Sequence, residues 1–334
     1  MRSVRGPIAA FLIAAWAPHL SSQAGPTQSV PLEPLTRIIE AFKTSDIVAL
    51  GEGTHGNEQG HRFRLSLLQD RRFAETVNDV VVEFGNSLYQ PVMDRFVANG
   101  EVSADDLKSV WRNTTQAHFP WDVPIYEEFF RTVRSLNASL PPNRRVRVLL
   151  GDPPINWSQV RNQADTERWN EQRESYPVDL LKREVLAKHR RALVIYGDGH
   201  FFRRSPYGSI VAGVEKEGGK VFAIATITDV DLEARQASVS RWPRPSVSML
   251  HGTVLGSLNV TDLLPLYRQE WLGHMENQFD ALLYLGPRSS ISYSRFPLTI
   301  CTDSSDVQLR LNRMELFPVL ANEIARLKRT CKWP

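Results

Sequence analysis

Several carboxylates and two histidines follow short apolar runs of the chain, and these residue types together can activate a water molecule. Glu52 and His55 share the segment Gly51-Glu52-Gly53-Thr54-His55-Gly56, Glu83 lies near the end of a second run, and His200 follows a fourth. A histidine with a pKa near 7 takes a proton from water when a carboxylate fixes its ring. We therefore predict His55 as the general base, with Glu52 and Glu83 orienting the ring or the water.

Three further polar residues are predicted to contact the substrate. Arg64 follows His55 on an expected helix, where its guanidinium would hold a substrate anion or a developing oxyanion. His200 would bind another substrate oxygen atom, with Asp152 beside it. The alternative for Arg64 is a structural ion pair with Glu83 that ties the first helix to the sheet.

The same side chains have a second use as metal ligands. His55, His200, Glu52 and Glu83 are acceptable ligands for a divalent cation, although their spacing matches no diagnostic pattern. The chain lacks G-x-S-x-G and H-E-x-x-H, which disfavours a serine esterase of the α/β-hydrolase type and a zincin. Activated water is then the expected nucleophile; we expect no cofactor, and a role for a divalent metal stays open. The segment 51–56 also fits G-x-G-x-x-G, but Glu52 would face the pyrophosphate of a dinucleotide.

The remaining histidines are predicted to have other environments. His61 and His189 lie on polar helical stretches and are expected to be solvated. His118 precedes Phe119 and is expected to pack a loop. We assign no role to the others.

Six continuous apolar runs supply the elements that must position these residues. Runs of this kind are typical of strands buried on both faces. Helix-like stretches between them, such as 34–42, 61–73 and 126–136, predict crossover connections, and hence an α/β fold with a mostly parallel central sheet flanked by helices. Ligands bind at the carboxyl ends of such strands. The expected strands are Asp46–Gly51, Asp79–Gly85, Arg145–Gly151, Arg191–Gly197, Lys220–Thr226 and Phe279–Gly286.

Two intervals break the alternation of strand and helix. Residues 87–140 are too many for one crossover, which predicts a helical insertion over the carboxyl ends of the strands. The interval 232–271 is rich in Ser and contains Pro243 and Pro245, so we interpret it as loops beside a cleft.

The N-terminus predicts export. Two arginines precede an apolar stretch, and Ser22-Gln23-Ala24 places small residues where signal peptidase reads them, so we expect a signal peptide cleaved after Ala24. An uncleaved anchor is the alternative. Residues 25–334 would then form a single domain in the periplasm or the medium, where oxidising conditions permit a bridge between Cys301 and Cys331. That bridge would stabilise by about 3–4 kcal/mol, but spacing alone leaves it open.

Composition narrows the function classes. The 40 basic residues nearly balance the 37 acidic ones, which gives no case for a nucleic-acid partner. No apolar run beyond the N-terminus reaches the length of about 18 residues that a spanning helix needs, so we expect no stable membrane insertion after signal cleavage. The expected partner is a small-molecule substrate, and partner proteins stay unknown.

The motif from Gly51 to Gly56 resembles the G-E-x-T-H-G motif of the erythromycin esterase family. Arg64 and Glu83 stand at offsets matching an Arg and a Glu of that family, and the stretch 121–152 is similar to its W…R-x-x-N…V-R-x-x-G-x-D pattern. The pair Arg173-Glu174 resembles the R-[DE] pair before the fourth strand. The likeness runs from about residue 46 to 204, with a fainter match at 279–281.

The resemblance implies a metal-independent attack of water on an ester or lactone, with His55 as base and Glu83 and Arg64 in the site. One segment departs from the family: Gly197-Asp198-Gly199-His200 replaces its usual H-N-x-H. This form is similar to the G-x-x-H of the wider superfamily that contains TraB/Tiki-type metal-dependent peptidases and ChaN-like haem-binding proteins. Those relatives imply two alternatives, a divalent-metal peptidase and a non-catalytic haem or ligand carrier.

Overall fold

The computed structural model describes residues 25–332, and the predicted signal peptide lies outside them. Seven strands form one sheet in the order β3-β2-β4-β1-β5-β7-β6. Every pair is parallel except β6 with β7. The strands are β1 (Ile47–Gly51), β2 (Asp79–Asn86), β3 (Arg147–Asp152), β4 (Ala192–Tyr196), β5 (Val221–Ile227), β6 (Ser246–Met249) and β7 (Ala281–Tyr284).

All six predicted strands are present, and the α/β fold class is confirmed. Their side chains are almost entirely buried, as continuous apolarity predicts for strands covered on both faces. The strand that we did not predict, β6, has the sequence Ser-Val-Ser-Met and is only four residues long. Its two serines interrupt the apolar run from which the other strands were recognised.

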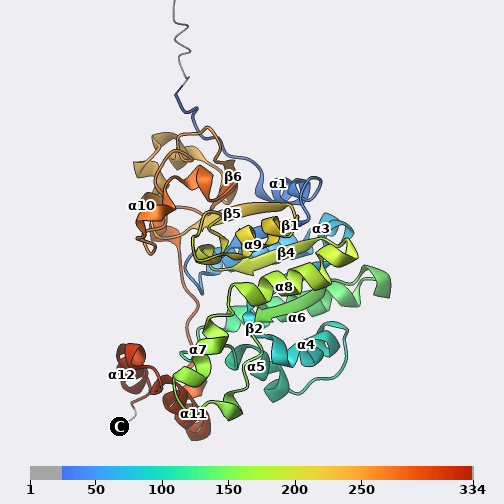
Figure 1. Ribbon diagram of the computed structural model, residues 1–334, viewed down its shortest axis with the longest axis vertical. Coiled ribbons are helices and arrows are strands. Elements are labelled where there is room, and N and C mark those ends of the chain that lie inside the picture. The colour runs from blue at the N-terminus through green and yellow to red at the C-terminus, as the bar shows by residue number, and fades with distance from the viewer. Residues whose placement is uncertain (1–24, 333–334) are drawn as a thin grey trace, which may run out of the picture.

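Helices cover both faces of the sheet (Figure 1). Apolar side chains of α1 to α6 pack with Val48, Leu50, Val80 and Val82 on one face, while those of α8, α9 and α10 pack with the alternate strand residues on the other. The α-helices are α1 (Pro34–Ala41), α2 (Glu58–Gln69), α3 (Arg71–Thr76), α4 (Gln90–Val97), α5 (Ala104–Arg112), α6 (Pro124–Ala138), α7 (Ala164–Asn170), α8 (Ser175–Glu184), α9 (Ile210–Lys216), α10 (Val260–Leu263), α11 (Ser304–Met314) and α12 (Ala321–Cys331).

The expected helix over 61–73 is two helices. Asp70 ends α2 in an extended conformation, and its carboxylate accepts the amide of Arg72 in the first turn of α3. An aspartate at this position caps a helix start, which sequence periodicity alone did not separate from a continuous helix.

The predicted helical insertion consists of α4, α5 and α6. The segment that joins α5 to α6 reaches the carboxyl ends of the strands, where the amide of Thr115 donates to Asp152 at the end of β3 over 2.8 Å. Trp121, from the same segment, is fully buried against the ring of His55. The insertion therefore forms one wall at the edge where the polar residues gather.

Residues 294–332, which we call the C-terminal cap, add a second wall. Figure 1 shows α11 and α12 at the end of the molecule that carries α5 and α7, away from α10. Arg313 of α11 donates to Asn113 beside α5 over 2.7 Å. A disulfide joins Cys301 to Cys331 across a Cα–Cα distance of 5.0 Å, which answers the question that spacing left open.

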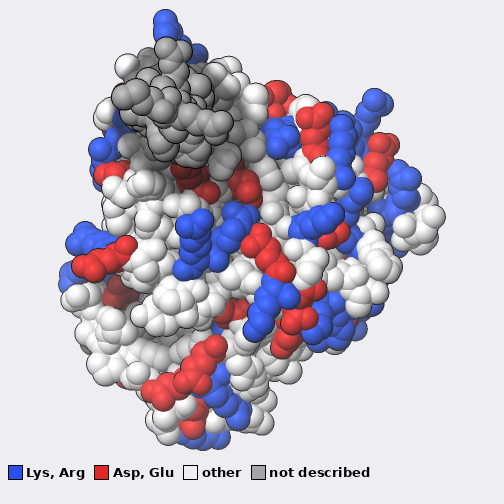
Figure 2. Space-filling model, turned by 45° about the horizontal axis from the view of Figure 1, so that its top comes forward, with Lys and Arg blue, Asp and Glu red and all other residues white. Residues whose placement is uncertain are grey.

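Charged side chains of both signs occur on the described surface (Figure 2). Basic and acidic side chains are interspersed on the face that Figure 2 shows, without a patch of one sign. Within residues 25–332, no helix combines the length and apolarity that crossing a bilayer requires.

Candidate active site

The loop after β1 is folded so that Glu52 and His55 face each other. Asn57 donates from Nδ2 to the carbonyls of Glu52 and Thr54, both over 2.7 Å, and caps α2 by accepting the amide of Gly60. Gly53 and Gly56 have φ angles of 67° and 80°, a region that disfavours residues with a Cβ. These glycines and Asn57 explain why the motif has this local form.

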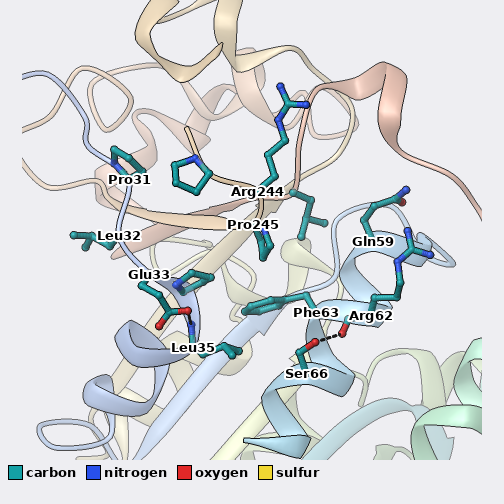
Figure 3. A pocket seen from close by; sticks show the side chains of 13 residues that line it. Pro31, Leu32, Glu33, Leu35, Gln59, Arg62, Phe63, Ser66, Arg244 and Pro245 are labelled. Carbon is teal, nitrogen blue, oxygen red and sulfur yellow. Dashed lines mark hydrogen bonds between the residues drawn. The ribbon is translucent and has the colours of Figure 1, made fainter. Parts of the chain in front are cut away.

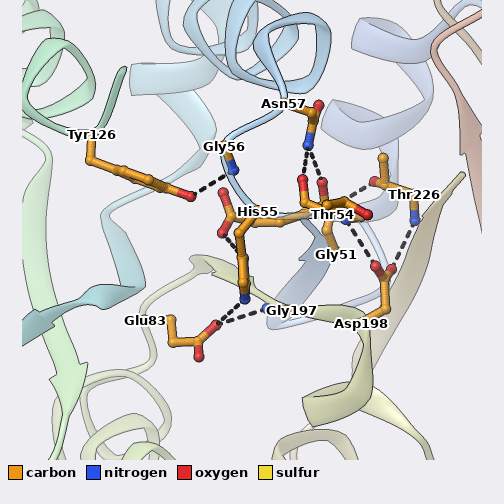
Figure 4. Close-up of polar contacts among 12 residues, drawn as sticks. Gly51, Thr54, His55, Gly56, Asn57, Glu83, Tyr126, Gly197, Asp198 and Thr226 are labelled. Atoms are coloured by element: carbon orange, nitrogen blue, oxygen red, sulfur yellow. Dashed lines mark hydrogen bonds and ion pairs between the residues drawn. The ribbon is translucent and has the colours of Figure 1, made fainter. Parts of the chain in front are cut away.

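His55 is oriented by a carboxylate. Its Nδ1 lies 2.8 Å from Oε2 of Glu52, while Nε2 lies 4.0 Å from Oε2 of Glu83 (Figure 4). Trp121 packs against the His55 ring edge to face, with 4.6 Å between the two ring centroids. With Glu52 ionised, Nδ1 carries the hydrogen and Nε2 keeps its lone pair.

Glu83 is the most heavily engaged carboxylate of the site. It is 2% exposed, and it accepts the amide of Gly197 over 2.9 Å, Gln116 over 3.0 Å and the guanidinium of Arg173 over 2.5 Å. Nε2 of His200 lies 3.3 Å from Oε1, the oxygen that also accepts from Gln116 and Arg173. Burial would raise the pKa of Glu83, but His200, His55 and Arg173 together hold it well below the usual range. Glu83 is therefore an anion at neutral pH.

The two histidines respond to these carboxylates. Burial would lower the pKa of His55, yet the hydrogen bond to Glu52 and the charge of Glu83 raise it above the ordinary value. Burial likewise opposes the charge on His200, but Glu83 and Glu174, the latter 2.6 Å from Nδ1, raise its pKa to about 9. His200 is consequently a cation near pH 7.

Arg64 lies behind Glu52 rather than toward the substrate. Its guanidinium is 3.0 Å from Oε1 of Glu52, and the side chain is 3% exposed. The predicted contact between Arg64 and substrate is therefore not supported, because the side chain is buried in an ion pair. The alternative pairing with Glu83 also fails, since Arg173 takes that place. Arg64 positions Glu52.

Asp152 is also remote from solvent. Its two oxygens accept the amide and the hydroxyl of Thr115 over 2.8 and 2.6 Å, and burial raises its pKa to about 7. Direct contact with substrate is not supported for this residue either. Its bonds instead hold the segment that carries Gln116 to the end of β3.

One carboxyl group of the site was not predicted. Asp198, after β4, accepts the amides of Gly53 and Thr226, each over 2.9 Å, so it joins the ends of three strands (Figure 4). Burial raises its pKa to about 7. Its position beside Gly199 and His200 in the sequence is the signal that was available.

Two other histidines differ from their predicted environments. His61 is 3% exposed and lies 2.9 Å from Glu128, so the prediction of a solvated side chain is wrong. His118 is exposed but lines a cavity with His55, so it does not simply pack a loop. The helical insertion contacts both regions. Its contacts with individual residues could not be predicted from the sequence.

The cavity beside His55 has a volume of about 620 Å³. Its walls come from the His55-Gly56 loop, the segment 118–123 and the C-terminal cap. A separate cavity of about 540 Å³ lies between Leu32, Phe63 and Pro245 on another part of the molecule and contains none of the predicted site residues (Figure 3). The cavity at His55 is therefore the one in which the predicted base is accessible.

Comparisons with known proteins identify the fold but no family. The sequence matches no protein-family profile and no curated protein significantly. A succinoglycan biosynthesis protein superposes with a TM-score of 0.53 at 9% identity, over 81% of this chain and 96% of that one. A mutant of the erythromycin esterase EreC in its open conformation gives 0.50 at 12%, over 78% and 94%. ChaN of Campylobacter jejuni, solved with cofacial haem, gives 0.39 at 14%, over 59% and 88%.

The first two superpositions show a distantly shared fold. The architecture that the motif resemblance implied is thus confirmed as a fold, whereas membership of a sequence family is not.

Proposed function

We propose that this protein hydrolyses a carboxylic ester or a lactone with a water molecule activated by His55. The observation that carries the proposal is the environment of that ring: Nδ1 is held by Glu52 at 2.8 Å, and the imidazole lines a cavity of about 620 Å³. A base fixed by a carboxylate at the wall of a cavity is the arrangement that water activation requires.

The proposed reaction begins with a water between His55 and Glu83. Two hydrogen bonds of about 2.8 Å span the 4.0 Å between Nε2 and Oε2 through one bent water. The water oxygen attacks the carbonyl carbon while its proton moves to Nε2. The tetrahedral intermediate then breaks the bond to the leaving oxygen, which takes the proton from Nε2 and departs as the alcohol.

The surrounding charges support this sequence of proton transfers. Glu52 stabilises the imidazolium that forms on His55, and Arg64 keeps Glu52 ionised. Arg173 and His200 do the same for Glu83. Each carboxylate thus has an arginine paired with it, the buried Arg64 or the partly exposed Arg173, and neither carboxylate needs to accept the proton itself.

Replacement of His55 tests the proposal. A panel of activated esters and lactones is assayed with the wild type, with His55→Ala, and with His251→Ala as a control, because His251 is exposed and remote in sequence from the site. We expect His55→Ala to lose about 10²–10⁴-fold in turnover at unchanged melting temperature. Turnover by His55→Ala at the wild-type rate contradicts the proposal, as does the absence of hydrolysis across the whole panel.

A metal-dependent peptidase is the second candidate, and one observation favours it. Glu52, His55 and Glu83 each offer a ligand atom within 4.8 Å of the other two. Among the described residues His200, the fourth predicted ligand, does not join this group. The donors fit a cation poorly, because Arg64 and Arg173 already pair with the two carboxylates and Glu52 occupies Nδ1 of His55.

Metal analysis separates the two candidates. Protein purified without chelator is analysed for bound metal, and its activity is measured before and after chelation. We expect activity to survive chelation. Loss of activity that zinc or manganese restores would favour the peptidase, while a Soret band on titration with haem, without turnover of any ester, would favour a carrier.

We also propose that the protein is exported by its N-terminal segment. The two arginines, the apolar stretch and the small residues before Gly25 support this. Fractionation of expressing cells, followed by N-terminal sequencing, tests it. We expect a mature chain that begins at Gly25 and lies outside the cytoplasm.

A further inference from the structure

The cavity beside His55 has an unbalanced charge. Three arginines line it, Arg295, Arg310 and Arg326, together with one carboxylate, Glu323. Arg310 is neutralised, since its guanidinium pairs with Asp122 and with Asp306. Within residues 25–332, no acidic side chain lies within ion-pair distance of the other two arginines.

Glu323 offsets only part of this charge. One of its oxygens is buried without a hydrogen-bond partner in the described chain, and it is the single acidic lining residue. His118 also lines the cavity, and its pKa lies below the ordinary histidine value because desolvation beside the wall disfavours its charged form. Two arginines without an ion-pair partner among the described residues and one carboxylate therefore line the cavity.

The remaining walls are apolar. Phe119, Pro120, Phe296, Met314 and Leu327 line the cavity between the catalytic loop and the cap. A volume of about 620 Å³ lies within the range of roughly 300–1,000 Å³ that small-molecule sites occupy. Such walls suit an extended hydrocarbon segment, and the arginines suit an anionic group joined to it.

The backbone next to Arg295 is hydrogen-bonded to the loop that carries His55. The amide of Ser294 donates to the carbonyl of Gly56 over 2.9 Å, and the amide of Glu58 donates to the carbonyl of Ser292 over 2.9 Å. Arg326 is carried by α12, which the disulfide from Cys331 joins to Cys301. The backbone segments that carry Arg295 and Arg326 are thus fixed at the cavity by two separate connections.

We propose that the substrate carries an anionic group, a carboxylate or a phosphate, separated from its ester by an apolar segment, and that Arg295 and Arg326 bind this group. The inference rests on the proposed hydrolysis at His55 and names the class of substrate. Arginine suits this task because its planar guanidinium donates two hydrogen bonds to one carboxylate or phosphate.

A matched pair of substrates tests the inference. The mono-4-nitrophenyl ester of adipic acid carries a free carboxylate, and its methyl ester is the neutral counterpart of nearly equal shape. We expect kcat/KM to favour the anionic ester by about five- to tenfold at low salt, and this preference to shrink in 1 M NaCl. A third ester with a terminal phosphonate distinguishes a preference for carboxylate from one for phosphate.

Variants of the cap assign the preference to residues. Arg295→Gln and Arg326→Gln should each reduce the ratio of the two kcat/KM values, whereas Glu323→Gln should increase it. Arg329→Gln is the matched control, because Arg329 lies on the same helix as Arg326 but does not line the cavity. Equal kcat/KM values for the two esters, or a ratio that Arg295→Gln and Arg326→Gln leave unchanged, overturn the inference.

A binding measurement separates this inference from the proposed reaction. Calorimetric titration of adipate into the His55→Ala variant reports on anion binding without turnover. Binding that Arg326→Gln weakens supports the anion site even if no ester is hydrolysed. Hydrolysis of both esters at one rate, with no adipate binding, leaves the reaction standing and removes the anion site.

Discussion

Two regions near the cavity at His55 are built in different ways. The reaction edge, which we define as Glu52, His55, Glu83, Arg173 and His200, is held by ion pairs to the buried carboxylates of Glu52 and Glu83. Its residues lie at the ends of β1, β2 and β4 and just before α8. No residue of α12 in the C-terminal cap is fully buried, and its apolar side chains Ile324 and Leu327 are of intermediate exposure. Its position depends on Arg310, Arg313 and the disulfide.

This difference separates the two tasks of the proposed enzyme. Proton transfer needs groups fixed to within a fraction of an ångström, and a buried hydrogen-bonded network supplies that precision. Selection of a substrate tolerates a looser wall, since an arginine on a flexible stem reaches an anion from several positions. We therefore expect changes at the edge to act on kcat and on folding, and changes in the cap to act on KM.

The largest expected effect comes from Glu83→Gln. Removing this charge leaves Arg173 without its hydrogen-bonded carboxylate in a buried setting, which costs about 3–5 kcal/mol of unfolding free energy. Turnover should fall by about 10²-fold or more. Denaturant unfolding and ester kinetics measure the two losses. Glu127→Gln, which breaks an exposed pair with Arg131, should cost less than about 1 kcal/mol, and equal costs for both variants would contradict a special role for the edge.

A cap without its disulfide should bind substrate poorly. In the Cys301→Ser/Cys331→Ser double variant, α12 loses the covalent link that holds it at the cavity, so we expect KM to rise about tenfold, equivalent to about 1.4 kcal/mol of binding. Most of the change should lie in KM rather than in kcat. Limited proteolysis should cleave the variant first within 294–332. A variant with the wild-type KM would show that the cap is held without the bridge.

The pH dependence of kcat/KM should also distinguish the reaction edge from the C-terminal cap. The pKa of His55 is raised, chiefly because the hydrogen bond to Glu52 and the charge of Glu83 outweigh the opposing effect of burial. The free base is lost as pH falls, so kcat/KM should decline on the acid side with an inflection above about 6.5. Glu83→Gln should move this inflection downward, while the double cysteine variant should keep it. An inflection below the ordinary histidine value in the wild type would argue against the assigned base.

The smallest effect concerns His200 and stability. Its folded-state pKa of about 9 exceeds the unfolded value of about 6.5, so protonated His200 stabilises the fold fully below pH 6.5 and this contribution is lost as pH rises through 9. The melting temperature of the wild type should therefore fall between pH 6.5 and 9 more than that of His200→Gln. Parallel melting curves over this interval would show that His200 does not titrate in this way.

Much of the reaction edge could be predicted because its residues stand at strand ends. The apolar runs located β1, β2 and β4, and parallel strands place their carboxyl ends at one edge, so Glu52, His55, Glu83 and His200 were expected together. Their proximity in the structure agrees with that expectation. Their roles in catalysis stay predictions.

The partners of these residues could not be predicted with the same success. Arg64 was assigned to substrate, but it pairs with Glu52, and Glu83 pairs with Arg173, ninety residues further along the chain. Several arginines could have reached either carboxylate, and spacing does not rank such long-range pairs. The R-E pair at 173–174 was noticed only through the family resemblance.

Six of the seven strands, the motif loop and the types of groups at the sheet edge could be predicted from the sequence, because hydrophobic periodicity and local turn chemistry depend on neighbouring residues. The three-dimensional structure was needed to show which arginine pairs with each carboxylate. It was also needed to show that the C-terminal cap lines the cavity with Arg295 and Arg326. These contacts join residues far apart in the chain, where the free energy of packing the whole domain, rather than any local preference, selects the partner.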